Sequence, residues 1–216
     1  MKAVWKNGPM DFSAAERARR IRLILFDVDG VLTDGKIWTL PLASVSQPSA
    51  DPAGQTFEPK GFHAQDGVGI SLARIGGIHC GFVTKRSSEA VAQRARALRI
   101  EYVYMGQDYK MHAVREIMQR GSFTLDQIAY VGDDVIDLPV MRVCGLAIAV
   151  ANARDQVKAA AHYITPNVGG QGAGRDAIDF VLAAHGTLDQ CIEEYLDERN
   201  AGTPATAASA DGRRGA

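Results

Sequence analysis

The chain has 216 residues, of which 46% are hydrophobic and 23% are charged, and its formal net charge is −1. This composition is typical of a globular protein with one sizeable α/β core. A nearly neutral chain without a long basic run is not expected to bind nucleic acid or an anionic membrane. No apolar run approaches membrane-spanning length, and the three cysteines (Cys80, Cys144 and Cys191) are widely spaced. These features favour a cytoplasmic location with reduced thiols.

Residues 1–20 predict a loose arm followed by a short helix, for which Ser13 and Glu16 have the spacing of a capping box. The apolar run at residues 23–26 then predicts a strand that is buried on both faces. Asp27 and Asp29 follow at the end of this strand, where a parallel sheet binds its ligands. Residues two apart in an extended strand point to the same side, so this pair can hold one hard cation.

Two simpler interpretations of the acidic pair need to be weighed. An exposed acidic turn is the commoner origin of a bare pair of aspartates. A calcium-binding loop is excluded, because the sixth position counted from Asp27 is Leu32 instead of glycine and a strand precedes the pair instead of a helix.

Residues 35–62 predict a hairpin insertion, with short strands in 36–40 and 55–58 joined by a Pro- and Ser-rich loop. The rest of the core, residues 21–186, alternates helices and strands, and Asp66 is the expected N-cap of the next helix. Strands are expected at 78–84, 101–104, 128–131, 146–150 and 162–165. This alternation predicts an α/β fold with a doubly wound, mostly parallel sheet. A C-terminal helix at 187–199 and a disordered tail at 200–216 complete the predicted organisation.

Polar residues follow successive predicted strands: Thr84 ends the second, Lys110 comes after the third and Asp133 comes after the fourth. Because the carboxyl ends of parallel strands meet at one edge of the sheet, these residues are expected to converge on Asp27 and Asp29. Each residue alone is more simply interpreted as a turn, cap or surface residue. Their order at successive strand ends indicates a functional site.

The segments 26–34 and 132–137, with Thr84 and Lys110 between them, resemble in this order the motifs of the haloacid dehalogenase superfamily of phosphohydrolases. The resemblance covers roughly residues 21–184. It implies a Rossmann-like fold and Mg²⁺-dependent hydrolysis of a phosphomonoester through an aspartyl-phosphate. The intervals between the motifs are too short for a cap domain, so the chain resembles the capless members, whose site is open.

The resemblance also implies a role for each carboxylate. Asp27 attacks phosphorus, while Asp29 protonates the leaving group and then activates water. The magnesium ion is held by Asp27, the backbone carbonyl of Asp29 and Asp133, and this shell is oriented by Asp134 and Asp137.

The phosphate oxygens are bound, by the same resemblance, by Thr84, Lys110 and the N–H groups near Gly30. The segments 29–35, 62–70, 130–141 and 169–175 resemble capless phosphatases of 3-deoxy-D-manno-octulosonate 8-phosphate, which serve lipopolysaccharide precursor synthesis, and their sialate-9-phosphate relatives. The substrate is then a phosphorylated sugar acid, and its carboxylate is expected to meet the cations Arg86 and Arg175, with Lys85 and Lys60 behind them.

Several alternatives stay open at this point. The substrate could be another 9-phosphorylated nonulosonic acid, because Lys85 replaces the glycine of the family's T-G-R motif. A phosphatase-like subunit of a carboxylase complex shares the same pattern, whereas a receiver-type signalling domain has its motifs in a different order. The open site and the apolar hairpin residues Ile37, Trp38, Leu40 and Phe57 predict a homo-oligomer, by resemblance a homotetramer.

Overall fold

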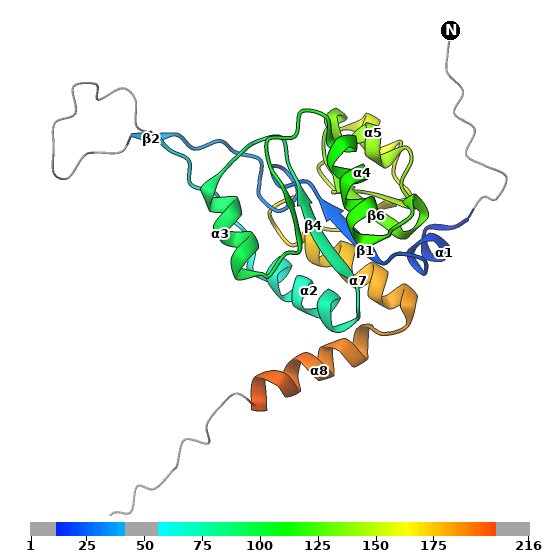
Figure 1. Cartoon of the computed structure of the whole chain (residues 1–216). Coiled ribbons are helices and arrows are strands. Elements are labelled where there is room, and N and C mark those ends of the chain that lie inside the picture. Colours follow the sequence, from blue (N-terminus) through cyan, green and yellow to red (C-terminus); the bar gives the residue numbers. More distant parts are fainter. Residues whose placement is uncertain (1–11, 42–55, 202–216) are drawn as a thin grey trace, which may run out of the picture.

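The computed structural model describes residues 12–41 and 56–201 (Figure 1). The arm predicted at the N-terminus, most of the hairpin loop and all but the first residues of the predicted tail lie outside the described residues. Within these ranges, no helix is both long enough and apolar enough to span a membrane.

The core is a sheet of six parallel strands in the order β5-β4-β1-β6-β7-β8. The strands are β1 (Leu23–Phe26), β4 (His79–Val83), β5 (Tyr102–Tyr104), β6 (Ile128–Gly132), β7 (Leu146–Ala149) and β8 (Tyr163–Ile164). The central strand β1 lies between β4 and β6, with Leu23 paired to His79 on one side and to Ile128 on the other. All four side chains of β1 are buried, as its unbroken apolar run predicts. The predicted doubly wound α/β fold is confirmed.

Helices cover both faces of this sheet (Figure 1). On one face, α2 (Ala64–Ile75) packs against α7 (Ala173–His185), with α1 (Ala14–Ala18) and α8 (Leu188–Ala201) beside them. On the other face lie α4 (Lys110–Gly121) and α5 (Leu138–Met141). The remaining helices are α3 (Glu89–Ala97), α6 (Asp155–Lys158) and the short 3₁₀ helices η1 (Leu125–Gln127) and η2 (Val135–Asp137).

One predicted helix cap is confirmed and another is wrong. The side chain of Ser13 accepts a hydrogen bond from the N–H of Glu16, and the carboxylate of Glu16 accepts one from the N–H of Ser13. Asp66, in contrast, does not begin α2, whose N-cap is His63. Its Oδ1 accepts a hydrogen bond from the N–H of Arg175 at 2.8 Å, so this carboxylate stabilises the first turn of α7. Only the tertiary fold brings this N–H group near Asp66.

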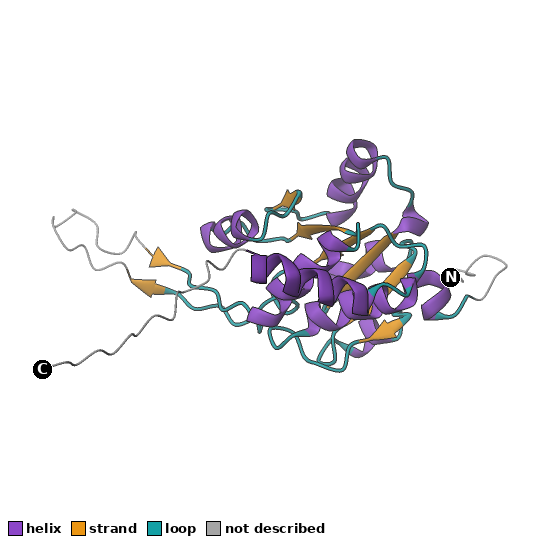
Figure 2. Cartoon of the chain, turned by 90° about the horizontal axis from the view of Figure 1, so that it is seen from below, coloured by secondary structure: helices purple, strands orange, loops and turns teal. Residues whose placement is uncertain are grey.

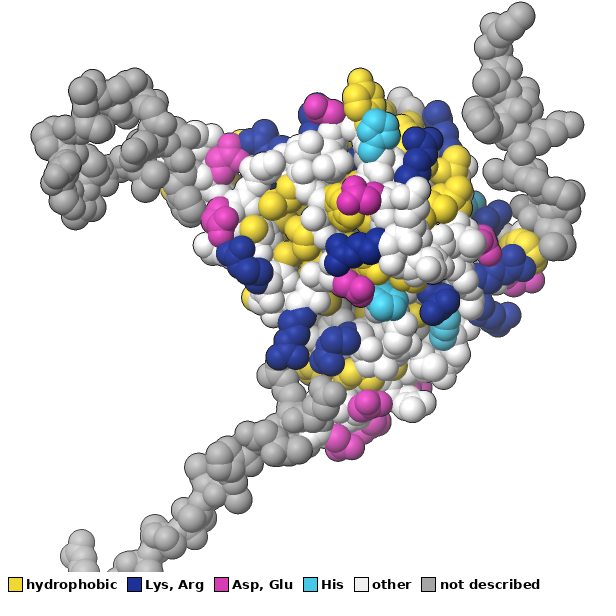
Figure 3. Space-filling model, in the orientation of Figure 1, with side chains coloured by type: hydrophobic (Ala, Val, Ile, Leu, Met, Phe, Trp, Pro, Cys, Tyr) yellow, Lys and Arg dark blue, Asp and Glu magenta, His cyan; other side chains and the backbone are white. Residues whose placement is uncertain are grey.

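The hairpin is separate from the main sheet and projects from the core (Figure 2). Its strands β2 (Leu40–Pro41) and β3 (Thr56–Phe57) are antiparallel and shorter than predicted. Among the described residues, the segment between β1 and β4 holds only this hairpin and α2. On the face of the molecule seen in Figure 3, positive and negative side chains are interspersed.

A glycine loop before α7 lies directly on the turn that follows β1. The N–H of Gly170 donates to the carbonyl oxygen of Val31 at 2.9 Å, and the N–H of Gly169 donates to Oδ1 of Asn152 at 2.8 Å. A Cβ atom on Gly169 would lie 1.7 Å from the carbonyl oxygen of Gly30, which is inside any possible contact distance. Glycine is therefore required here for the close approach of two backbones.

We therefore expect Gly169→Ala to lower the free energy of unfolding by about 1–3 kcal/mol, because the added methyl group forces two backbones apart. Chemical denaturation measures this loss. Gly61→Ala is the matched control, since a Cβ atom on Gly61 meets nothing within 4 Å. Equal stability of the two variants would contradict the packing described for this loop.

Candidate active site

The carboxyl ends of the strands bring Lys110, Asp133 and Asp137 together around Asp27, which follows β1 and is only 3% exposed. Nζ of Lys110, the first residue of α4, lies 2.9 Å from Oδ1 of Asp27. The N–H of Val28 donates to the same oxygen at 2.7 Å, so the carboxylate is held in one orientation. Thr84, directly after β4, is also buried.

Asp137 is fully buried and accepts four hydrogen bonds. Its Oδ1 accepts from Nζ of Lys110 at 2.6 Å and from the hydroxyl of Tyr130 at 2.9 Å. Its Oδ2 accepts from the backbone N–H groups of Asp133 and Asp134, at 3.0 and 3.3 Å. These donors occupy the lone pairs of both oxygens, so Asp137 is better suited to orient its neighbours than to bind a metal directly.

Tyr130 is a site residue that the sequence reasoning missed. It lies in β6 and is fully buried, and its hydroxyl group donates to Asp137. A tyrosine in the middle of a buried strand needs a partner for its hydroxyl group, and this requirement was the available signal.

Burial of several carboxylates at one edge perturbs their protonation. Burial raises the pKa of Asp27 to about 7, although the adjacent Lys110 opposes this shift. Burial, reinforced by the charge of Asp27, raises the pKa of Asp133 to about 7 as well. Burial alone would lower the pKa of Lys110, but the charges of Asp27 and Asp137 outweigh it, so this pKa is raised. The site therefore has an excess of negative charge that a bound cation would neutralise.

The donor set fits a magnesium ion. Carboxylate oxygens of Asp27, Asp133 and Asp137 lie within 4.8 Å of one another. Oδ1 of Asp133 is buried and has no hydrogen-bond partner among the described residues, which is typical of an oxygen that serves as a metal ligand. Gly30, whose φ is +95°, leaves this space open, because a Cβ atom there would lie 2.2 Å from Oδ2 of Asp133. Oxygen ligands of this kind are those that Mg²⁺ prefers.

The carboxylate of Asp29 is placed differently from that of Asp27. It forms an ion pair with Lys60, whose side chain is only 3% exposed. Lys60 was predicted as a peripheral substrate cation, and the structure places its ammonium group directly on Asp29. Asp134 is the N-cap of η2, where its Oδ1 accepts the N–H of Val135 at 2.7 Å.

The other predicted cations differ in their surroundings. Nη2 of Arg86 contacts both carboxylate oxygens of Glu58, at 2.6 and 2.9 Å. Lys85 is exposed and lies 3.7 Å from Asp108. The guanidinium group of Arg175 is hydrogen-bonded at 2.6 Å to Asp179, four residues further along α7.

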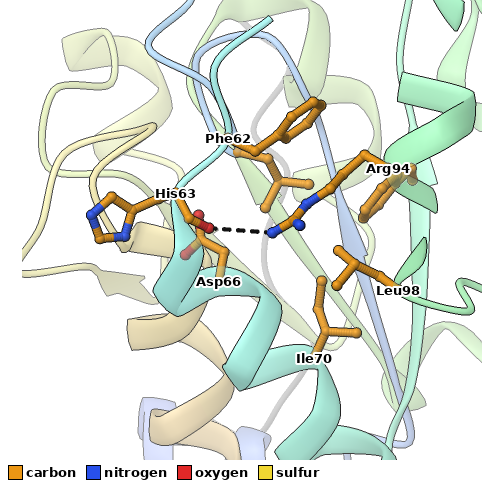
Figure 4. Close-up of a pocket in the computed structure, with 8 residues that line it drawn as sticks. Phe62, His63, Asp66, Ile70, Arg94 and Leu98 are labelled. Atoms are coloured by element: carbon orange, nitrogen blue, oxygen red, sulfur yellow. Dashed lines mark hydrogen bonds between the residues drawn. The ribbon is translucent and has the colours of Figure 1, made fainter. Parts of the chain in front are cut away.

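A small cavity of about 10 Å³ lies beneath the segment that leads into α2 (Figure 4). Nη2 of Arg94 reaches the carbonyl oxygen of His63 at 3.4 Å, and the guanidinium group lies 5.6 Å from the ring centre of Phe62. This cavity is too small to bind a sugar phosphate. The contacts of Arg94 instead hold the segment in place.

Comparison with known proteins identifies relatives of this chain. The model of the haloacid dehalogenase-like hydrolases matches residues 76–173. The 3-deoxy-D-manno-octulosonate 8-phosphate phosphatase KdsC of Escherichia coli (strain K12) is 36% identical over 183 residues, which cover 85% of this chain and 90% of that protein.

Two solved structures are similar over most of their length. The phosphatase of the same name from Yersinia pestis has a TM-score of 0.74 and 36% identity, covering 82% of this chain and 88% of that one. The one from Moraxella catarrhalis, in complex with a magnesium ion, a phosphate ion and a KDO molecule, has a TM-score of 0.76 and 34% identity, covering 84% and 97%.

The fold and the acidic edge of the sheet together define a haloacid dehalogenase-like hydrolase, so the resemblance drawn from the motifs is confirmed. With this identity over nearly the whole chain, the protein belongs to the family of 3-deoxy-D-manno-octulosonate 8-phosphate phosphatases.

The raised pKa values of Asp27 and Asp133 predict how metal binding depends on pH. Each carboxyl has a pKa of about 7 in the folded chain against an ordinary value of 3.8, so it takes up protons on folding. The metal-free protein should therefore lose stability as the pH rises from about 4 through about 7. Mg²⁺ should then raise the melting temperature more at about pH 8 than at about pH 5.

Differential scanning calorimetry with and without Mg²⁺ measures this difference. Asp133→Asn removes one of the two carboxyls and should reduce both the pH dependence and the stabilisation by Mg²⁺. A rise in melting temperature that is the same at both pH values would contradict the charge excess described here.

Proposed function

We propose that the protein is a Mg²⁺-dependent phosphatase that hydrolyses 3-deoxy-D-manno-octulosonate 8-phosphate through an aspartyl-phosphate on Asp27. The observation that carries this proposal is the buried Asp27 carboxylate, oriented by Lys110 and adjacent to the unpartnered oxygen of Asp133. The similarity to phosphatases of that name supports the choice of substrate.

The first step requires an ionised nucleophile beside a dianionic phosphate. Lys110 favours the ionised form of Asp27 and attracts the phosphate oxygens, so it reduces the repulsion between the two anions. A bound Mg²⁺, held by Asp27, Asp133 and the backbone carbonyl of Asp29, supplies further charge neutralisation. Asp137 keeps Lys110 in place, and both Asp137 and Asp134 orient the turn that carries Asp133.

Asp29 is the acid–base group of the proposal. It lies two residues after the nucleophile, in the turn that follows β1, and its carboxylate pairs with Lys60. In this proposal it protonates the leaving oxygen and then activates the water that hydrolyses the intermediate. Thr84 and the backbone N–H groups near Gly30 bind the phosphate oxygens.

The carboxylate of the sugar acid is bound, in this proposal, by the cations at the mouth of the site. Arg86 is the first candidate, because it lies two residues after Thr84 and its side chain is 39% exposed. Lys60 lies on Asp29 itself. Arg175 is the second candidate, and Lys85 lies behind both. Like Arg86 with Glu58, each of these cations is paired with a carboxylate in the structure, Asp179 and Asp108.

We expect Asp27→Asn to reduce kcat for 3-deoxy-D-manno-octulosonate 8-phosphate by at least about a thousandfold, because an amide cannot attack phosphorus. A phosphate-release assay with excess Mg²⁺, run alongside ordinary sugar phosphates, measures both activity and selectivity. Asp189→Asn, at an exposed position of α8, is the control. Turnover of the Asp27→Asn protein within tenfold of the original would refute the mechanism.

We further propose that the protein acts in the cytoplasm as a homotetramer in which hairpins pack together and a neighbouring subunit covers the open site. The exposed apolar side chains of Ile37, Trp38 and Leu40, at 58%, 55% and 47%, support this assembly. The side chain of Phe57, predicted to contribute, lies outside the described residues.

Trp38→Ser should shift the oligomer towards smaller species, because it removes an apolar side chain worth about 25 cal/mol for each Å² that the interface buries. Light scattering across a dilution series measures this shift. Val143→Ser changes another exposed apolar side chain, far along the chain in the turn after α5, and serves as the control. A monomeric original protein at assay concentration would contradict the assembly.

A further inference from the structure

Four charged side chains of alternating sign lie together at the mouth of the site. Lys60 forms an ion pair with Asp29, and Glu58 forms one with Arg86. The two pairs are close enough to interact, since Lys60 helps to lower the pKa of Glu58 and Asp29 helps to raise that of Arg86. Glu58 and Lys60 both belong to the short segment without regular secondary structure between β3 and α2, which we call the charged arm (residues 58–60).

The ion pair between Glu58 and Arg86 does not use the Nε–H donor of Arg86. Both oxygens of Glu58 contact the same nitrogen, Nη2 of Arg86. Nε of Arg86 is buried and has no hydrogen-bond partner among the described residues. A carboxylate that approached the edge of the guanidinium group could bond Nε and Nη2 together, which is the stronger arrangement.

Buried contacts anchor the chain on the C-terminal side of Glu58. The buried ammonium group of Lys60 holds the arm to Asp29. Further along, Arg94 holds the carbonyl group of His63 and the ring of Phe62, as Figure 4 shows. The Glu58 side chain, in contrast, is 33% exposed, so it can leave Arg86 without disturbing these buried contacts.

We propose that Glu58 occupies the place of the substrate's carboxylate on Arg86 and that a sugar acid must displace it to bind. Glu58 is then a specificity-determining residue that weakens the binding of every carboxylate ligand and leaves phosphate esters without a carboxylate unaffected. This inference rests on the sugar-acid substrate of the proposed function. It deepens that function by naming the group with which the substrate competes.

If Glu58 oriented Arg86 instead of competing with the substrate, its removal would change the affinity for the sugar acid in the opposite direction. If Glu58 served to orient Arg86 towards the substrate, its removal would weaken the binding of the sugar acid. If it competes with the substrate, its removal strengthens that binding. A half-exposed ion pair contributes little, so the expected gain in affinity is about two- to fivefold.

The decisive measurement is isothermal titration of the free sugar acid 3-deoxy-D-manno-octulosonate into the Mg²⁺-loaded protein and its Glu58→Gln variant. We expect the Kd of the variant to be lower by that factor. The ratio of the KM for p-nitrophenyl phosphate, which has no carboxylate, to the KM for the 8-phosphate should rise to the same extent. Glu58→Asp keeps the charge but shortens the side chain, and it should change both quantities in the same direction.

Two further variants show that the effect passes through Arg86. Glu58→Gln should have no effect when Arg86 is already replaced in Arg86→Gln. Glu89→Gln breaks an ion pair of the same type, between Glu89 and Nη2 of Arg96 at 2.6 Å on the surface of α3, and should leave the Kd unchanged.

An unchanged or higher Kd in Glu58→Gln, or no binding of the sugar acid to the original protein, would overturn the inference. The titration does not depend on turnover. Tighter binding without hydrolysis would therefore refute the proposed function alone, and hydrolysis with an unchanged Kd would refute this inference alone.

Discussion

The site depends on one buried cation. Lys110 is almost wholly removed from solvent and lies between the carboxylates of Asp27 and Asp137, at 2.9 and 2.6 Å. Burying three charges is costly, and it is tolerated only where each charge has a close partner and further hydrogen bonds. Asp137 meets this requirement through Tyr130 and the backbone of the preceding turn, so Asp27, Lys110 and the turn that carries Asp133 form one connected network.

The network has too few positive charges for its carboxylates. Asp27 and Asp133 both have pKa values of about 7, because burial opposes their ionisation and so does the negative charge of neighbouring carboxylates, Asp137 foremost for Asp27 and Asp27 for Asp133. A site in this state favours a divalent cation and a phosphate together, since the cation neutralises the carboxylates and the phosphate in turn neutralises the cation. The same charge excess links metal binding to pH.

Backbone packing holds this network at the carboxyl edge of the sheet. The turn after β1 has no room for a side chain at Gly30, where Asp133 lies, and the glycine loop before α7 presses against the same turn from the other side. Asp66 fastens the start of α7 to α2, so the glycine loop and the helices beneath it are tied to one another. The charged arm links the end of β3 to the site, because Lys60 pairs with Asp29 and Glu58 pairs with Arg86.

Much of the fold and the chemical centre could be predicted from local patterns. The apolar run of β1, the alternation of strands and helices, and the order of Asp27, Thr84, Lys110 and Asp133 all follow from neighbours in the chain. Parallel strands then bring their carboxyl ends to one edge of the sheet, whatever the details of packing. For this reason the acidic cluster and Lys110 lie at the carboxyl edge of the sheet, as their positions in the sequence predict.

The partners of the charged side chains were decided only by the tertiary structure. No spacing in the sequence shows that Asp66 accepts a bond from α7, that the buried hydroxyl of Tyr130 donates to Asp137, or that Glu58 pairs with Arg86. These contacts join residues from different elements, and a charged side chain can take any partner that the packing brings within reach. The sequence by itself determined which polar residues follow the strands, and the fold decided which charges surround them.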